Sequence, residues 1–227
     1  MPEYTPPDFE AADREVAEAL STLKRHGLQV NFPEDVQKRL DSYILFEGDD
    51  GLFKALLPSV KNYFEYGCGK STEYLYKYSN VNIYSVDTSQ EWASKIQGLS
   101  KDKGDNRLNV KWVDVGPVID WGTPESFVKR QNFAEYANWF WELGVDPDLV
   151  VIDGRFRVCC FLTSIKFAPV GTKILFDDYA DRPSYHVAEE FLPVIDRCGR
   201  QVLFEVDSHA KEKVDDDVIS GFRNVVG

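Results

Sequence analysis

One short segment constrains the fold of this chain more than any other, the loop Tyr66-Gly67-Cys68-Gly69-Lys70-Ser71-Thr72. It follows an apolar, strand-like stretch at 62–66 and precedes a stretch with helical spacing at 72–78. Glycine permits both a tight turn and the close approach of a ligand to the main chain. A strand, a glycine loop and a helix in this order are typical of nucleotide-binding α/β domains.

The rest of the chain alternates strand-like and helix-like segments. We expect strands at 62–66, 82–86, 108–113, 149–152, 173–176 and 201–206, and helices at 72–78, 90–99, 158–167 and 184–195. This alternation predicts an α/β fold with a doubly wound, Rossmann-like, mostly parallel sheet. A charged connection too short for a covering helix joins 201–206 to a segment at 218–226, so we expect these two to form a C-terminal antiparallel hairpin.

Two regions lie outside this alternation. Segments at 9–26, 33–45 and 51–57 have helical spacing, and we expect them to form an N-terminal helical cover over residues 1–58, with the α/β core at 59–227. The stretch 116–144, with three tryptophans, is longer than a usual connection and is either a lid or a packed surface helix. No repeat or glycine–serine linker divides the chain, so we expect a single domain over 1–227.

Charge and composition exclude several partners. The 38 acidic and 26 basic side chains leave a net charge of −12, which disfavours nucleic acid and anionic membrane surfaces. The start of the sequence lacks the pattern of a secretory signal, and no apolar stretch is as long as a membrane span, so we expect a cytoplasmic protein. The four cysteines lack the spacing of a zinc site and are expected to be reduced thiols.

The glycine loop does not match two common nucleotide motifs. A phosphate loop would need glycine at the position of Phe64, and a dinucleotide fingerprint starting at Gly67 would need glycine at the position of Thr72. The loop therefore indicates a nucleotide cofactor without identifying it.

A resemblance identifies a family. The run Glu65-Tyr66-Gly67-Cys68-Gly69 resembles the first motif of the class I S-adenosylmethionine-dependent methyltransferases, although Ser71 replaces the usual third glycine. Asp87, 20 residues beyond Gly67, is similar to the acidic residue that holds the ribose hydroxyls, and Asp114 to the one that meets the adenine amino group. The resemblance covers roughly residues 60–206 and implies S-adenosylmethionine as the cofactor. The implied cofactor-binding residues are Glu65, Gly67, Cys68, Gly69, Ser71, Thr72, Asp87 and Asp114.

Acidic residues follow the fourth and fifth expected strands. Asp153, Asp177 and Asp178 resemble the metal ligands of the catechol and caffeoyl-coenzyme A O-methyltransferases, except that Asp178 replaces an asparagine. Converging carboxylates repel one another, and a hard cation such as Mg²⁺ or Ca²⁺ would neutralise them. The alternative is that Arg155 and Arg157 neutralise them, in which case no metal is needed.

The same segments supply candidate catalytic residues. Arg155 and Arg157 suit recognition of a carboxylate or phosphate on a substrate, and His186 suits a general base. The candidate catalytic set is Asp153, Arg155, Arg157, Asp178 and His186.

The resemblance favours methylation of oxygen. The Asn/Asp-Pro-Pro-Tyr segment of amino-methylating relatives is absent, and Ile152-Asp153-Gly154-Arg155 stands in its place. We therefore expect an enzyme that methylates a small, hydroxylated molecule. This molecule is either neutral or anionic. Two alternatives stay open, namely a non-catalytic cofactor-binding protein and a nicotinamide-dependent oxidoreductase. The acceptor and the oligomeric state are not determined by the sequence.

Overall fold

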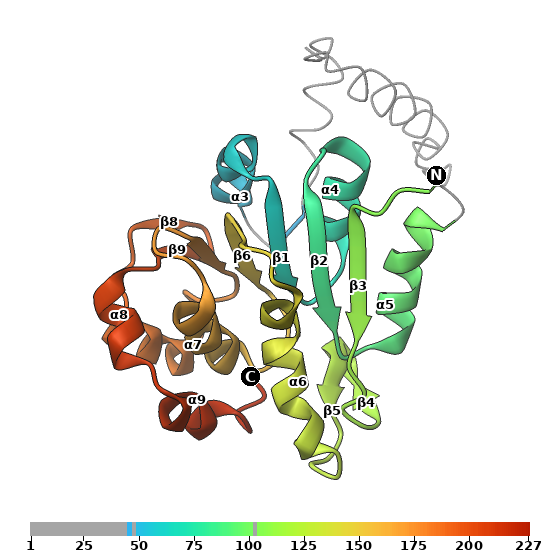
Figure 1. The fold of residues 1–227 in the computed structure, drawn as a ribbon. Helices are drawn as coiled ribbons and strands as arrows, with labels where there is room; N and C mark the ends of the chain where they lie inside the picture. The colour runs from blue at the N-terminus through green and yellow to red at the C-terminus, as the bar shows by residue number, and fades with distance from the viewer. Residues whose placement is uncertain (1–44, 47–48, 102–103) are drawn as a thin grey trace, which may run out of the picture.

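The computed structural model describes residues 45–46, 49–101 and 104–227 (Figure 1). The helix expected at 9–26 lies outside the described residues, and so does the one expected at 33–45 except for Leu45, which is not in a helix. The helix expected at 51–57 is present as α3 (Gly51–Leu56), and a 3₁₀ turn (Leu57–Ser59) leads from it into the sheet.

A seven-stranded sheet in the order β3-β2-β1-β6-β7-β9-β8 forms the centre of the molecule. Its parallel strands are β1 (Asn62–Tyr66), β2 (Asn82–Asp87), β3 (Leu108–Trp112), β6 (Leu149–Ile152) and β7 (Lys173–Phe176). The antiparallel strands β8 (Asp196–Cys198) and β9 (Gln201–Glu205) complete one edge. The predicted doubly wound, mostly parallel sheet is confirmed.

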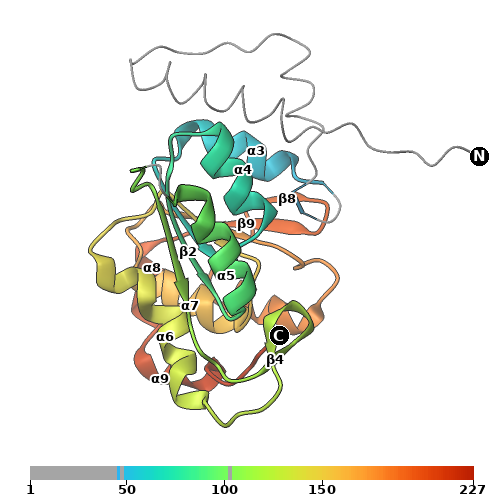
Figure 2. The ribbon, with the colours of Figure 1, turned by 90° about the vertical axis from the view of Figure 1, so that its right-hand side faces the viewer.

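Side chains alternate between two apolar layers along each central strand. Phe64 and Tyr66 of β1 face one layer, whereas Tyr63 faces the other. All four residues of β6 are buried, as expected for a strand covered on both faces. Figure 2 shows α5 (Gln90–Gln97) on one side of the sheet and α6 (Phe133–Asn138) and α7 (Arg157–Phe167) on the other.

The antiparallel hairpin is present, but its expected second strand at 218–226 is wrong. That segment contains the helix α9 (Asp216–Phe222), which follows α8 (Ser208–Lys213). The side chain of Asp215 accepts the Val218 N–H at 2.8 Å and caps α9, and two aspartates occupy its first turn. The partner of β9 is β8, which precedes it in the chain. The helix expected at 184–195 is a shorter 3₁₀ helix (Pro183–Glu190).

The long stretch at 116–144 divides into two parts. Its first part forms the small hairpin of β4 (Val118–Ile119) and β5 (Thr123–Pro124), which is bonded to the end of β2 through Thr88 Oγ1 and the Gly122 carbonyl, 2.6 Å apart. Its second part contains α6 and a 3₁₀ helix (Trp139–Leu143), whose buried aromatic side chains pack in the core. The second part is therefore a packed helix and not a lid.

Across the described portion of the chain, every helix is too short or too polar to cross a bilayer.

Candidate functional site

The strand order reverses between β1 and β6, and the loops that follow these two strands touch through their backbones. Gly67 has φ +95°, and a Cβ built on it would lie 2.8 Å from Gly154 Cα. A Cβ on Gly154 would lie 2.0 Å from the Tyr136 hydroxyl. Any larger residue at either position would overlap its neighbours, so the two glycines allow the loops to meet. Open α/β sheets bind ligands at such a reversal point.

Asp87 ties the glycine loop to the end of β2. Its carboxylate accepts the N–H of Cys68 at 2.8 Å and that of Ser89 at 2.6 Å. Burial raises the pKa of Asp87, and the two backbone N–H groups oppose the increase. Cys68 contributes through its backbone, because burial also raises the pKa of its thiol and keeps it protonated.

Glu65 lies behind the loop and is fully buried. Its carboxylate accepts hydrogen bonds from four hydroxyl groups, those of Tyr63 at 2.8 Å, Ser85 at 3.4 Å, and Ser71 and Thr72. Burial raises its pKa to about 7, although the hydroxyl groups lower it. The side chains of Glu65, Ser71 and Thr72 therefore bind one another and support the loop from behind.

Gly69 begins the helix α4 (Lys70–Tyr78). Its N–H donates to Thr72 Oγ1 at 2.9 Å, and a Cβ at this position would have no neighbour within 4 Å. There is thus room for a side chain at Gly69, in contrast to Gly67.

Asp114 lies beyond the end of β3 and is held by the stretch 116–144. Its carboxylate pairs with Lys129 and accepts the Gly116 N–H at 3.0 Å, and its carbonyl accepts from Asn132 at 2.7 Å. The side chain remains 38% exposed. This long stretch therefore positions Asp114 at the rim of the site.

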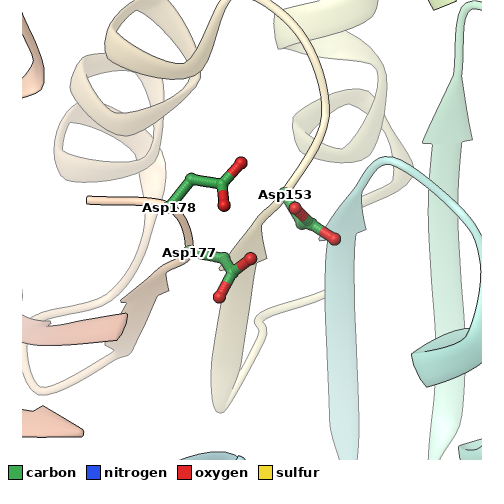
Figure 3. Close-up of side chains that lie close together, drawn as sticks. All are labelled: Asp153, Asp177 and Asp178. Carbon is green, nitrogen blue, oxygen red and sulfur yellow. The ribbon is translucent and has the colours of Figure 1, made fainter. Parts of the chain in front are cut away.

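Three aspartates come together at the ends of β6 and β7. Figure 3 shows Asp153, Asp177 and Asp178 from these two neighbouring strand ends, and one oxygen of each lies within 4.8 Å of the others. Asp178 has φ +59°, an unusual conformation for a residue with a side chain. The structure thus brings together the three residues that the sequence pairs as metal ligands.

Arginines pair with two of these three carboxylates. Asp178 pairs with Arg157 at 3.0 Å, with Arg182 at 2.9 Å and with Arg200. Arg157, which is 2% exposed, also pairs with Asp153 at 3.1 Å. We refer to the six residues Asp153, Asp177, Asp178, Arg157, Arg182 and Arg200 as the Asp–Arg cluster.

The donor set of the Asp–Arg cluster does not fit a divalent cation while the arginines are in place. A cation would have to displace three guanidinium groups from Asp178, and Asp177 already accepts the side-chain amide of Gln201 at 2.9 Å. Burial raises the pKa of Asp177, and Arg157 opposes the increase. Of the two arginines considered from the sequence, Arg157 neutralises the carboxylates and Arg155 does not.

Arg182, Arg200 and Gln201 have no signal in the sequence that assigns them to this place. Arg200 and Gln201 reach the cluster because β9 pairs with β7. The sequence alone predicts that this strand pairs with the segment 218–226 instead. Gly154 and Tyr136 were also missed, since their roles depend on contacts between distant loops.

His186 is apart from the cluster. Its ring stacks on Tyr179 with centroids 5.0 Å apart, and its Nε2 lies 3.3 Å from the Tyr179 carbonyl. Among the residues that the structure describes, no hydrogen bond joins His186 to the three aspartates.

Comparisons with solved structures find proteins that are similar to this chain. A methyltransferase-like protein from Silicibacter pomeroyi has a similar structure, with 28% sequence identity and a TM-score of 0.63 over 79% of this chain and 88% of that one. An O-methyltransferase from Bacillus cereus, solved with S-adenosylhomocysteine, matches with 14% identity and a TM-score of 0.45 over 90% of this chain and 94% of that one. No protein-family model and no curated protein sequence matches the chain.

Four observations point the same way: the strand order of the sheet, the glycine loop, the acidic residue at the end of β2 and the similarity to the Silicibacter protein. The chain thus resembles the class I S-adenosylmethionine-dependent methyltransferases, and its fold is the Rossmann-like fold of that superfamily.

Proposed function

We propose that this protein is a methyltransferase that uses S-adenosylmethionine to methylate a hydroxyl group of a small molecule. One observation supports the proposal most strongly, the contact of Gly67 with Gly154 at the reversal point of the sheet, beside Asp87. Nucleotides bind at this place in open α/β sheets, where an acidic residue after the second strand meets the ribose. The similarity to the methyltransferase-like protein of Silicibacter pomeroyi supports the same reaction.

The residues present fit this cofactor. At Gly69 the missing side chain leaves the backbone open to close approach, since a Cβ there would have no neighbour within 4 Å, and Asp87 offers carboxylate oxygens for ribose hydroxyls. Asp114, with Lys129 beside it, stands at the rim where adenine would lie. The cofactor would supply a methyl group bonded to a positively charged sulfur.

Asp153 is the candidate for the base. Burial of the strand ends raises its pKa well above the usual range, and Arg157 opposes that increase while holding the carboxylate in place. The Asp153 side chain is 35% exposed to solvent. A carboxylate with a raised pKa suits removal of a hydroxyl proton. Asp153 would accept the proton of the acceptor hydroxyl, and the bound cofactor would supply the methyl group to that oxygen.

Calorimetric titration with S-adenosylhomocysteine tests the cofactor assignment. We expect the wild type to bind, and Asp87→Asn to bind at least about tenfold more weakly, because hydrogen bonds to a charged group contribute about 1.5–3 kcal/mol. Asp114→Asn should lose less, since Lys129 already holds that carboxylate. Failure of the wild type to bind, or tighter binding of NADH, would overturn the proposal.

Transfer itself needs a second assay. S-adenosylmethionine with a labelled methyl group would be incubated with a panel of small hydroxylated acceptors, using wild type and Asp153→Asn. We expect labelled product from the wild type and a loss of about 10²-fold or more in the variant, the usual contribution of a general base. Cofactor binding without transfer to any acceptor would instead favour a non-catalytic binding protein.

A further inference from the structure

Arg155 differs from the other arginines of the site. Arg157, Arg182 and Arg200 all pair with Asp178, whereas no carboxylate in the described ranges 45–46, 49–101 and 104–227 pairs with Arg155. Within the described residues, its Nε is buried without a hydrogen-bond partner, and its Nη1 donates to Thr123 Oγ1, 3.5 Å away. The side chain as a whole is half-buried, but a buried donor such as this Nε is costly unless a ligand completes it.

Two buried tyrosines near Arg155 also have unused donors. The Tyr136 hydroxyl accepts the Arg155 backbone N–H at 3.3 Å, and the Tyr185 hydroxyl accepts from Arg182 at 3.3 Å. Each side chain is 1% exposed. In the described part of the chain, neither O–H hydrogen has an acceptor. The surroundings of Arg155 therefore contain several donors without matching acceptors.

These groups converge from different parts of the chain. A Cβ built on Gly227 would lie 3.3 Å from Arg155 Nη1 and 3.6 Å from the Tyr185 hydroxyl, so both groups lie beside Gly227. Tyr136 lies against Gly154, the residue that precedes Arg155. Burial lowers the pKa of Arg155, and the neighbouring Arg157 lowers it further, so a negative ligand would relieve both effects.

We propose that Arg155, with the hydroxyls of Tyr136 and Tyr185, binds a carboxylate or phosphate group of the methyl acceptor. The acceptor is then a hydroxylated small acid. A guanidinium group matches the two oxygens of such an anion, and hydroxyl donors can complete the remaining lone pairs. Arg157 cannot take this role, because its nitrogens already bond to Asp153, Asp178 and main-chain carbonyls.

The interpretation as an acceptor site rests on the proposed function, but anion binding is measurable without methyl transfer. Calorimetry would compare benzoate with benzamide, and phenyl phosphate with phenol, in the presence of S-adenosylhomocysteine. We expect at least one anion to bind the wild type about tenfold more tightly than its neutral partner. Arg155→Met should abolish this preference, and Arg155→Lys should restore part of it. The preferred anion shows whether the natural group is a carboxylate or a phosphate.

Matched controls separate this role from others. Arg130→Met makes the same change at an exposed position outside the site and should keep the preference. Binding of S-adenosylhomocysteine and of methylthioadenosine, which lacks the amino acid carboxylate, should be unchanged by Arg155→Met. A selective loss of S-adenosylhomocysteine binding would assign Arg155 to the cofactor and overturn the proposal. Equal binding of every anion by wild type and a folded Arg155→Met would also overturn it. Anion preference without cofactor binding would reject only the proposed function.

Discussion

At the end of β1, Glu65 is buried among four hydroxyl groups, whereas at the end of β7, Asp178 is paired with three guanidinium groups. Both carboxylates support loops of the same site. The first is balanced only by neutral donors, and burial raises its pKa to about 7. The second belongs to the Asp–Arg cluster, where fixed positive charges balance it. The comparison teaches that one site can stabilise its loops by a protonatable hydrogen-bond network on one side and by ion pairs on the other.

Removing the buried Arg157 from the Asp–Arg cluster should cause the largest loss of stability. Arg157→Met leaves Asp153 without its partner and Asp178 with one guanidinium fewer, so we expect a loss of about 3–5 kcal/mol in unfolding free energy. Arg182→Met is the matched control, because Arg182 pairs with the same Asp178 but is 38% exposed, and it should lose about 1 kcal/mol or less. Urea denaturation measures both. Similar losses in the two variants would contradict the importance of burial here.

The pH dependence of stability tests the Glu65 side. Its pKa is about 7 in the folded protein against an ordinary value of 4.5, so between these values the folded state holds a proton that the unfolded state releases. Stability from this group is present below pH 4.5 and is lost as the pH rises to 7. The loss is up to about 3 kcal/mol.

Glu65→Gln removes the titrating group and is therefore the control for this pH effect. Denaturation of both proteins across this pH range should show the variant gaining stability relative to wild type as the pH rises. A relative stability that stays constant with pH would show that Glu65 is ionised throughout.

The contact between Gly67 and Gly154 joins the two regions, and substitutions at the glycines test how tight it is. Gly67→Ala places a side chain at φ +95° and against the backbone of Gly154, and it should cost about 1–3 kcal/mol and weaken cofactor binding. Gly69→Ala has free space and extended φ of −175°, so it should change thermal stability far less. Equal shifts in melting temperature would show that the contact between the loops is not tight.

The smallest expected effect concerns metal. Since arginines occupy Asp178, millimolar Mg²⁺ or its removal with a chelator should leave the melting temperature and methyl transfer unchanged. A ligand at 100 times its dissociation constant would add about 2.7 kcal/mol of stability, which thermal denaturation detects readily. A saturable increase with Mg²⁺ would show that the cation displaces the guanidinium groups.

Much of the fold was predictable because local patterns determine it. The parallel strands were predicted within a residue of their observed ends, since each is a short apolar run between turn residues. The pairing of β9 was not, because β8 has two exposed residues among its three and carries no apolar pattern. The segment 218–226 has enough β-branched residues to resemble a strand, yet the capping aspartate Asp215 favours a helix.

The site was predictable only in part. The convergence of Asp153, Asp177 and Asp178 followed from neighbouring parallel strands that end at one edge. The burial of Glu65 behind the loop followed from side-chain alternation along β1, which a motif alone does not reveal. The different roles of Arg155 and Arg157 could not be predicted from the sequence, because two residues in one turn can contact different partners.

The position of β6 beside β1 has a consequence for the order of folding. Strands β1, β2 and β3 follow one another closely in sequence, but β6 must return across more than 80 residues to pair Tyr63 with Leu149. Closing this longer loop costs more entropy than the connections between β1, β2 and β3, and non-local pairing of this kind is slow to form. We therefore expect Asp87 and the glycine loop to be in place before Gly154 arrives. Binding of the proposed cofactor during refolding would then report the pairing of β6 with β1, after the early half of the sheet has formed.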